Sequence, residues 1–356
     1  MKILQVCPKY YPSIGGVEEH VRNISERLAK KHDVTVFTTD PSGKLPKEEV
    51  INGVKIKRFK SWAPDEAYYF SDALRKSLIR HSNEFDVVHA HNYHAFPALY
   101  AANAKKTGRF VFTAHYFAKG STSFRSFLHM PYKLFGKKIF QKADAIISIS
   151  NFEKNLLCEN FRISSDKVTV IPHGVALKSF GGLRKSHHPW RTILYVGRLV
   201  KYKGIDYVIN TLPYLDQDIR LEIIGSGPYY PHLLKLVNKL GLTDRVSFLG
   251  GGLSKAEILQ KYADADLFIL LSKYEGFAIS VAEALAAGTV CIVANVSALT
   301  EWVDNHNCFG VNYPINIESL KKLVNETIGR RAVGVKLFDW DDSVARIVNV
   351  YRGVKF

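Results

Sequence analysis

The feature that most constrains the fold is an alternation of short apolar runs with helical patterns, which occurs twice along the chain. The first series opens with an apolar run at 2–7, a helical pattern at 17–31 and another apolar run at 33–39. Its remaining apolar runs lie at 54–59, 87–90, 110–114, 145–150 and 168–171. Such runs are typical of strands in parallel sheets that helices cover on both faces.

A second series follows the polar stretch 181–189, with apolar runs at 192–196, 220–224, 246–249, 267–271 and 290–294. At 356 residues, the chain also exceeds the size that one hydrophobic core usually serves. We therefore expect an α/β protein with two doubly wound, Rossmann-like domains that face each other across a cleft. The expected domains are 1–180 and 181–337, and 338–356 is expected to form a terminal helix with Asp342 or Ser343 as its N-cap.

The net charge of +16 is unevenly distributed. Residues 1–180 contain 28 lysines and arginines against 16 acidic residues, whereas residues 181–356 contain 21 against 17. The first half is therefore expected to face an anionic partner or surface. The alternative is that this charge only keeps the protein soluble.

The chain contains no apolar run near the roughly 18–20 residues that a transmembrane helix needs. Its first residues resemble a strand rather than a signal peptide, so we expect a cytoplasmic protein. The four cysteines are scattered without metal-ligand spacing, and we expect all of them to be reduced.

The segment from Glu275 to Glu283 is the first candidate site. It follows a buried strand pattern and precedes a run of helix formers, so Glu275 lies where open α/β sheets bind ligands. Backbone N–H groups near 278–281 would then form an electropositive cup suited to phosphate. The alternative is structural: Ser280 and Glu283 fit a capping box, and Glu275 is a solvated loop residue.

Three further loops follow predicted strands and carry residues suited to a nucleotide. Gly15 and Gly16 precede the first helix, where they either let the backbone approach an anion or form a plain turn. Arg198 and Lys203 follow the strand at 192–196 and would neutralise a diphosphate, or form a solvated basic loop. The third loop contains Gly225 and Gly227, a turn that would lie against a base or ribose.

A group of histidines suggests a metal cluster: His89, His91, His94 and His115. A nearby pair of carboxylates is missing from the sequence pattern, so we expect no metal site. His115 follows an apolar run, and this position at the end of a strand favours a functional role over core packing.

These loops, in this order, resemble glycosyltransferase family 4, a group of retaining enzymes with the GT-B architecture. The resemblance covers essentially the whole chain, and the segments that carry it are 11–18, 86–91, 112–115, 170–175, 197–204, 224–228, 274–284 and 338–340. The last of these is similar to the segment that, in that architecture, crosses back to the N-terminal domain.

The resemblance implies roles for particular residues. Glu275 would contact the transferred sugar, Arg198 and Lys203 the donor diphosphate, and His115 would lie near the sugar and the acceptor. The implied donor-binding residues are Gly15, Gly16, Gly225, Gly227, Gly276, Phe277, Ala278, Ile279, Ser280 and Glu283, of which Glu283 would hold the ribose. The sequence departs from the family at Ala278, often a glycine, and at 297–298, where a glycine pair is common.

The resemblance further implies retaining, metal-independent transfer of a sugar to a hydroxyl of a glycan or lipid-linked acceptor. The donor would be a nucleotide sugar, UDP- or GDP-linked, with no cofactor and no nucleic-acid partner. A nucleotide-sugar epimerase of the same architecture is the alternative. An oxidoreductase would need a GxGxxG fingerprint after the first strand, and the sequence lacks one there.

The segment 119–142 goes beyond the family pattern, with six basic residues, no acidic residue and many large apolar side chains. This composition suits the surface of an anionic membrane. We therefore hypothesise association with the inner face of a membrane. The alternative is an ordinary helix that packs its apolar face on its own domain.

Overall fold

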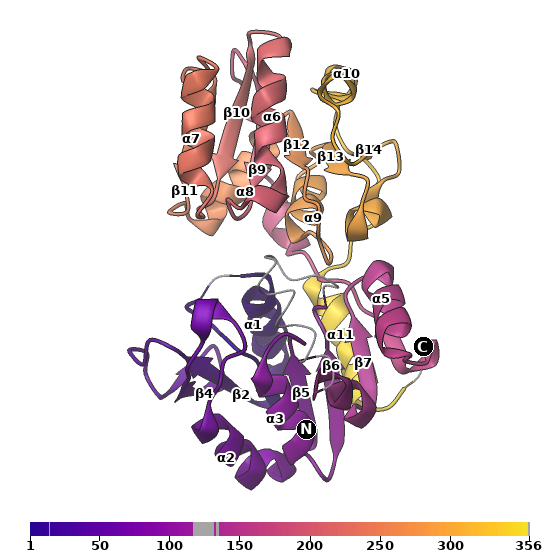
Figure 1. The fold of residues 1–356 in the computed structure, drawn as a ribbon. Coiled ribbons are helices and arrows are strands. Elements are labelled where there is room, and N and C mark those ends of the chain that lie inside the picture. The colour runs from indigo at the N-terminus through magenta and orange to yellow at the C-terminus, as the bar shows by residue number, and fades with distance from the viewer. Residues whose placement is uncertain (14, 117–131, 133–134, 355–356) are drawn as a thin grey trace. The chain divides into compact units, whose positions relative to one another are not determined.

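The computed structural model describes the whole chain except residues 14, 117–131, 133–134 and 355–356. The chain forms two compact units (Figure 1). The first contains Met1–Gly174 together with Trp340–Phe356, and the second contains Val175–Asp339. Each unit is built around a largely parallel sheet, which confirms the predicted α/β fold class.

The sheet of the first unit has the strand order β3-β4-β2-β1-β5-β6-β7-β8. Only the pairing of β3 with β4 is antiparallel among these described strands. The strands are β1 (Lys2–Val6), β2 (Asp33–Asp40), β3 (Glu48–Ile51), β4 (Val54–Lys60), β5 (Val87–His91), β6 (Arg109–Thr113), β7 (Ala145–Ser148) and β8 (Val168–Val170).

The helices of the first unit are α1 (Gly16–Leu28), α2 (Asp72–His81), α3 (Phe96–Ala104), α5 (Asn151–Phe161) and α11 (Trp340–Tyr351); residues 135–142 are also helical. Helix α11 comes from the far end of the sequence and packs on α1 (Figure 1). Arg27 of α1 forms an ion pair with Asp341 of α11 at 3.1 Å.

The sheet of the second unit has the order β11-β10-β9-β12-β13-β14, and its paired strands are parallel. The strands are β9 (Arg191–Val196), β10 (Ile219–Ile224), β11 (Val246–Gly250), β12 (Leu267–Leu270), β13 (Cys291–Ala294) and β14 (Cys308–Val311). The helices are α6 (Ile205–Thr211), α7 (Tyr230–Lys239), α8 (Lys255–Asp264), α9 (Ile279–Ala286) and α10 (Ile317–Thr327).

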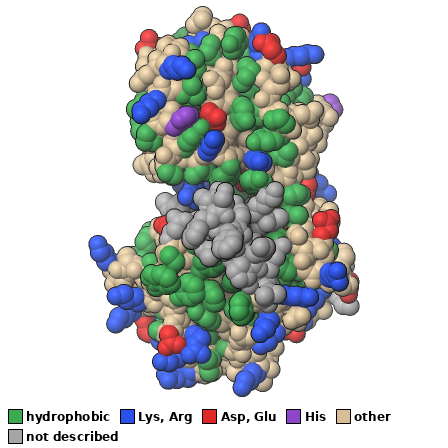
Figure 2. Space-filling view, in the orientation of Figure 1, with side chains coloured by type: hydrophobic (Ala, Val, Ile, Leu, Met, Phe, Trp, Pro, Cys, Tyr) green, Lys and Arg blue, Asp and Glu red, His purple; other side chains and the backbone are tan. Residues whose placement is uncertain are grey.

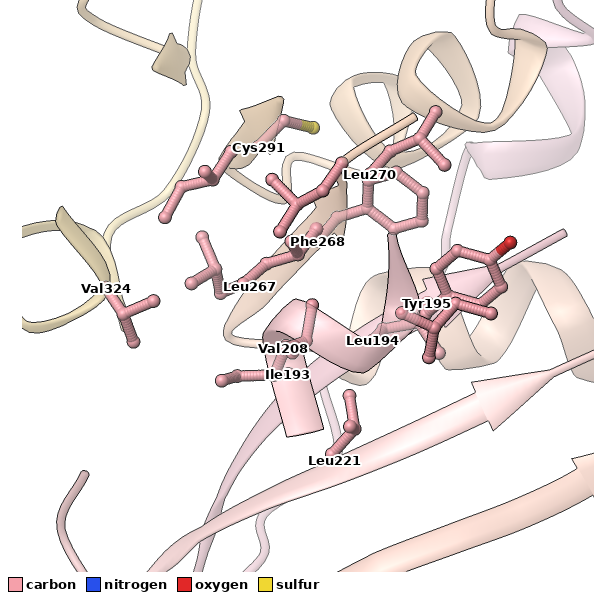
Figure 3. Packing of buried hydrophobic residues seen from close by; sticks show 14 of the residues in the cluster. Ile193, Leu194, Tyr195, Val208, Leu221, Leu267, Phe268, Leu270, Cys291 and Val324 are labelled. Carbon is pink, nitrogen blue, oxygen red and sulfur yellow. The ribbon is translucent and has the colours of Figure 1, made fainter. Parts of the chain in front are cut away.

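The core of the second unit lies along its two central strands, β9 and β12. Figure 3 shows Ile193 and Leu194 of β9 beside Leu267 and Phe268 of β12, and all four are fully buried. Each such side chain contributes about 1.5–3 kcal/mol on burial. Burial and pairing therefore hold the two strands side by side, which sets where the loops that follow them begin.

The start of the last helix differs from the prediction. Helix α11 begins at Trp340, so Asp342 and Ser343 lie inside it and neither is its N-cap. The Ser343 hydroxyl instead donates a hydrogen bond to the carbonyl of Pro172 at 3.0 Å. The predicted cap was wrong because the aromatic ring of Trp340, 4% exposed, already belongs to the buried face of the helix.

Basic side chains outnumber acidic ones on the visible face of the first unit in Figure 2. Most of the segment 119–142 lies outside the described residues, so the membrane hypothesis stays a prediction from sequence. Among the helices that the structure describes, none combines the length and apolar character needed to cross a membrane.

Candidate functional site

The centre of the second sheet is a topological switch point. Counted in chain order, its strands run 3-2-1-4-5-6, and the direction of winding reverses between β9 and β12. Leu267 pairs with Ile193 across this junction. Open α/β sheets bind ligands outside the carboxyl ends of the strands at such a point. The loops that follow β9 and β12 are the ones that carry Lys203 and Glu275.

Lys203 and Glu275 form an ion pair between these two loops. Their side chains are only 15% and 12% exposed, respectively. Burial alone would lower the pKa of Lys203, but the neighbouring Glu275 carboxylate and Tyr202 together outweigh it and hold that pKa above its usual range. The lysine is therefore charged at neutral pH. Its ammonium group has three donors, of which Glu275 uses one, so it can also bind an anionic ligand.

Arg198 lies on the same loop as Lys203, and its side chain is exposed. The hydroxyl of Tyr195 donates a hydrogen bond to the Arg198 carbonyl at 2.9 Å, which fixes the backbone just after β9. The guanidinium is close enough to Lys203 to oppose the rise in its pKa. Two cations at one strand end favour a polyanionic ligand such as a diphosphate.

Gly225 and Gly227 bring the loop after β10 against the loop after β9. Gly225 has a φ of +141°, and a Cβ built there would lie 2.0 Å from the Gly197 carbonyl oxygen. A Cβ at Gly227 would lie 2.3 Å from the Leu199 carbonyl oxygen. The two loops also exchange a hydrogen bond from Leu199 N–H to the Ser226 carbonyl at 2.9 Å. These glycines are therefore needed for backbone packing, whether or not a ligand also contacts them.

The loop of Glu275 is held by residues that the sequence analysis did not identify. The Glu275 N–H donates to the Ser297 hydroxyl at 3.1 Å, and the Trp302 indole N–H donates to the Phe277 carbonyl at 2.6 Å. The rings of Phe277 and Trp302 also meet edge to face. Ser297 and Trp302 lie beyond the next strand, so only the pairing of β12 with β13 brings them here.

Helix α9 does not begin with the capping box that Ser280 and Glu283 suggested. The helix starts at Ile279, and its N-cap is Ala278, which makes no side-chain capping bond. Glu283 therefore lies beyond the first turn, and it forms an ion pair with Lys255 of α8. Ala278 has a φ of +70°, a left-handed conformation that favours glycine, which is common at this position in the family.

Gly276, Ile279 and Ser280 complete the predicted donor loop. Gly276 is buried, while Ile279 and Ser280 are partly exposed at the first turn of α9. The backbone N–H groups of Val281 and Ala282 donate to the Ala278 carbonyl. The N–H groups of the residues before Val281 are therefore the ones that this helix end can offer to a ligand.

The remaining predicted residues lie in the first unit. Gly15 and Gly16 lie at the start of α1, and neither has a left-handed φ. A Cβ at Gly16 would meet no described atom within 4 Å, so the fold itself does not require a glycine there. The structure thus divides the predicted residues: Arg198, Lys203 and the 275–283 segment lie in one unit, and Gly15, Gly16 and His115 lie in the other.

His115 follows β6 and is 5% exposed, among other histidines. Its ring lies 5.2 Å from that of His20 and 6.0 Å from that of His91, between ring centres. His94 is not part of this group, since its ring stacks on Tyr116. His20 was overlooked because it lies on the helical pattern at 17–31; its spacing of four residues from the buried Ile24 is the signal that could have located it.

Comparisons with known proteins identify the family of this chain. Residues 14–179 match the profile of Glycosyltransferase Family 4, and residues 184–331 match that of Glycosyl transferases group 1. An uncharacterised glycosyltransferase of Methanocaldococcus jannaschii is 30% identical, with 99% of this chain and 98% of that protein covered. A GDP-mannose:cellobiosyl-diphosphopolyprenol alpha-mannosyltransferase of Xanthomonas oryzae is 26% identical, with 99% of this chain and 97% of that protein covered.

The fold has a solved counterpart in HepE of Anabaena in complex with UDP-glucose. The TM-score is 0.79 at 18% identity, over 99% of this chain and 100% of HepE. The sequence matches thus identify a glycosyltransferase, and the fold has the GT-B architecture. The chain belongs to the group 1 glycosyltransferases, with the family 4 profile over its first part. The epimerase alternative finds no support in these matches.

Proposed function

We propose that this glycosyltransferase is a retaining, metal-independent enzyme that uses a nucleotide-diphosphate-sugar donor. The acceptor is a hydroxyl of a glycan or of a lipid-linked sugar. The observation that carries the proposal is the buried Lys203–Glu275 ion pair at the switch point of the second sheet. A charged pair in this position binds a ligand that has both an anionic part and hydroxyl groups, and a nucleotide sugar has both.

In this proposal, Arg198 and Lys203 bind the donor diphosphate. Charge develops on the diphosphate as the glycosidic bond to the sugar breaks, and two fixed cations stabilise the leaving group more than they stabilise the bound donor. The cations replace a metal ion in this role. The sequence offers no obvious carboxylate nucleophile on the N-terminal side, so in this proposal the acceptor hydroxyl attacks from the face that the diphosphate leaves, which retains the anomeric configuration.

Glu275 orients the transferred sugar, since its side-chain oxygens pair with Lys203 and can also accept hydrogen bonds from sugar hydroxyls. Glu283 binds the ribose, and for this it exchanges its exposed partner Lys255 for ribose hydroxyls. The mannosyltransferase of Xanthomonas uses GDP-mannose and HepE binds UDP-glucose, which supports a nucleotide-sugar donor without selecting the base.

In this proposal, Gly15 and Gly16 of the first unit also belong to the donor-binding residues, and His115 is the histidine assigned to the sugar. The lack of any described atom near a Cβ at Gly16 supports a backbone approach to a ligand. The excess of basic residues in 1–180 supports acceptor binding by the first unit, because lipid-linked acceptors carry phosphate.

The test is sugar transfer by Glu275→Gln and Lys203→Ala variants, measured with radiolabelled donors. Each should reduce kcat/KM at least a hundredfold, about 2.7 kcal/mol of transition-state stabilisation. Lys203→Ala also leaves a buried carboxylate unpaired, so the folded fraction of each variant must be measured by circular dichroism. Near-normal transfer by a folded Glu275→Gln protein would refute the assignment.

A matched control exists in the same unit. Glu222 and Lys261 form a partly buried ion pair at 2.9 Å, outside the loops of the site. Glu222→Gln should leave kcat/KM within about twofold of the wild type, since it removes a similar pair without touching the donor.

The base and the sugar can be identified by thermal shift with UDP-, GDP- and ADP-sugars. A ligand at a hundred times its dissociation constant adds about 2.7 kcal/mol of stability. Formation of a new sugar nucleotide without an acceptor would indicate an epimerase instead.

A further inference from the structure

Five histidines are buried together at the carboxyl-end side of the first sheet. His89 and His91 belong to β5, and His20 belongs to α1. His115 and His173 follow β6 and β8. All five are at most 5% exposed, and His20 packs at ring-centre distances of 4.6 Å from His173 and 5.6 Å from His91. A concentration of imidazoles without solvent around it needs a chemical explanation, because buried polar atoms are normally paired.

Three members of this group converge on one point. His20, His91 and His115 each offer a ring nitrogen, and these three nitrogens lie within 4.8 Å of one another. Each of the three rings also has one buried nitrogen with no hydrogen-bond partner among the described residues: Nε2 of His20, Nδ1 of His91 and Nε2 of His115. Each of the three converging rings therefore has one buried nitrogen without a hydrogen-bond partner among the described residues.

Hydrogen bonds around the group fix which nitrogen of His91 carries the proton. The Gln5 amide donates to the Tyr351 hydroxyl at 3.0 Å, and its oxygen therefore accepts from His91 Nε2–H at 2.8 Å. With its proton on Nε2, neutral His91 has a lone pair on Nδ1. A ring whose other nitrogen donates to an amide is the usual arrangement of a metal-ligating histidine.

The partner of His20 allows the same arrangement. His20 Nδ1 lies 2.8 Å from Nδ1 of His173, and one of these two nitrogens must be the donor. When His20 donates, its Nε2 keeps a lone pair. A neutral ring that donates from one nitrogen keeps its lone pair on the other, and this is the form that binds metals.

We propose that His20, His91 and His115 form a three-histidine site for a divalent transition metal of the zinc type. Imidazole nitrogens suit Zn²⁺, Co²⁺, Ni²⁺ and Cu²⁺, whereas the absence of a carboxylate among the three ligands disfavours Mg²⁺ and Ca²⁺. Zn–N bonds of about 2.0–2.1 Å hold three ligand nitrogens closer together than 4.8 Å, so binding draws the rings inward.

The role of such an ion is structural. Its ligands join α1, β5 and the segment after β6, which lie far apart in the sequence of the first unit. The cations proposed for sugar transfer, Arg198 and Lys203, lie in the second unit. The ion supplies none of the chemistry of transfer, so metal binding and metal-independent transfer are compatible. His115 belongs to both proposals, as a metal ligand here and as the histidine assigned to the sugar there, and the test of the metal site does not depend on activity.

The experiment uses the full chain, stripped with a chelator and dialysed against Zn²⁺. We expect about one equivalent of bound zinc by elemental analysis and a rise in Tm of roughly 3 °C or more. His91→Gln should bind less than a tenth as much. His94→Ala is the matched control, since His94 lies in the same unit but stacks on Tyr116, and it should bind one equivalent.

A second measurement covers the case in which His91→Gln does not fold. X-ray absorption of the zinc-loaded wild type should show an imidazole shell at about 2.0–2.1 Å without sulfur. Failure of the folded, metal-free wild type to bind zinc would overturn the proposal. So would equal binding by folded His91→Gln, or a zinc shell that contains sulfur or only oxygen.

Discussion

Among single residues, Glu153 is the acidic side chain most completely removed from water in the described first unit, at 1% exposed. Its two carboxylate oxygens accept hydrogen bonds from the backbone N–H groups of Tyr116 and Ile149, at 2.6 and 2.7 Å. Burial raises its pKa to about 7, and these hydrogen bonds only partly oppose the rise. The carboxylate thus joins the start of α5 to the segment after β6.

The pKa of Glu153 predicts a pH dependence of stability. Between pH 4.5, the ordinary pKa, and about 7, the native state keeps a proton that the unfolded state has lost. The contribution of this group to stability is therefore largest below pH 4.5 and is lost as the pH rises to 7, by on the order of 3 kcal/mol. Glu153→Gln cannot ionise and should lack this decrease.

Urea unfolding of both proteins at pH 5, 6, 7 and 8 provides the measurement. The stability advantage of the wild type over Glu153→Gln should shrink as the pH rises and then become constant. Taking the difference removes the titration of all other groups, including the histidines. A difference that does not vary with pH would contradict the assigned pKa.

At the scale of elements, the loops after β9 and β10 fit together through their backbones. The closest approach is at Gly225, where a Cβ would lie 2.0 Å from a backbone carbonyl oxygen. Backbone cannot move aside as the end of a flexible side chain can. This packing sets the position of the strand end from which Arg198 and Lys203 project.

Gly225→Ala should destabilise the second unit by at least about 2 kcal/mol, from both the left-handed φ and the clash. Gly252→Ala is the control, because no atom lies within 4 Å of a Cβ there; it should change stability by no more than about 0.5 kcal/mol. Differential scanning calorimetry measures both. Equal Tm values for the two variants would show that the loops can separate without cost.

Most strands could be predicted from the sequence because strands buried on both faces of a parallel sheet are nearly continuous apolar runs. Two were missed. β3 (Glu48–Ile51) begins with two glutamates at the edge of its sheet, and β14 (Cys308–Val311) is short and contains Gly310. Both strands lie at an edge of their sheet, where part of a strand faces water, and in these two the apolar run is too short to be recognised.

The candidate site was predictable only in part. Loops at strand ends can be located from the sequence, and this predicts that Arg198, Lys203 and Glu275 belong to the site. The contact between Lys203 and Glu275 could not be predicted, because the residues are 72 positions apart and meet only through the pairing of β9 with β12. The same holds for His20, which reaches His115 only when α1 packs on the sheet.

At the scale of the whole molecule, the two ends of the chain meet inside the first unit. The Tyr351 hydroxyl of α11 lies 2.7 Å from Nδ1 of His89, and it accepts a hydrogen bond from Gln5 of β1. Tyr351 is 4% exposed, and burial raises the pKa of its hydroxyl. The hydroxyl therefore stays protonated and can donate to His89.

Tyr351→Phe should lower the free energy of unfolding by about 2 kcal/mol, because it leaves the Gln5 amide and His89 buried without their partner. Tyr214→Phe is the control, at a tyrosine that is 59% exposed, and it should change stability by less than about 0.5 kcal/mol. Both values come from urea unfolding. A loss below about 0.5 kcal/mol for Tyr351→Phe would show that the neighbouring groups find other partners.

The position of α11 in the first unit also affects the order in which the two units are completed during translation. Because the first unit is made of Met1–Gly174 and Trp340–Phe356, a ribosome finishes all of the second unit before it delivers the last helix of the first. Domains generally fold as units during translation, in the order in which they are completed. If the first unit needs α11 to complete its fold, it becomes complete only after the second unit, although most of its sequence is translated earlier.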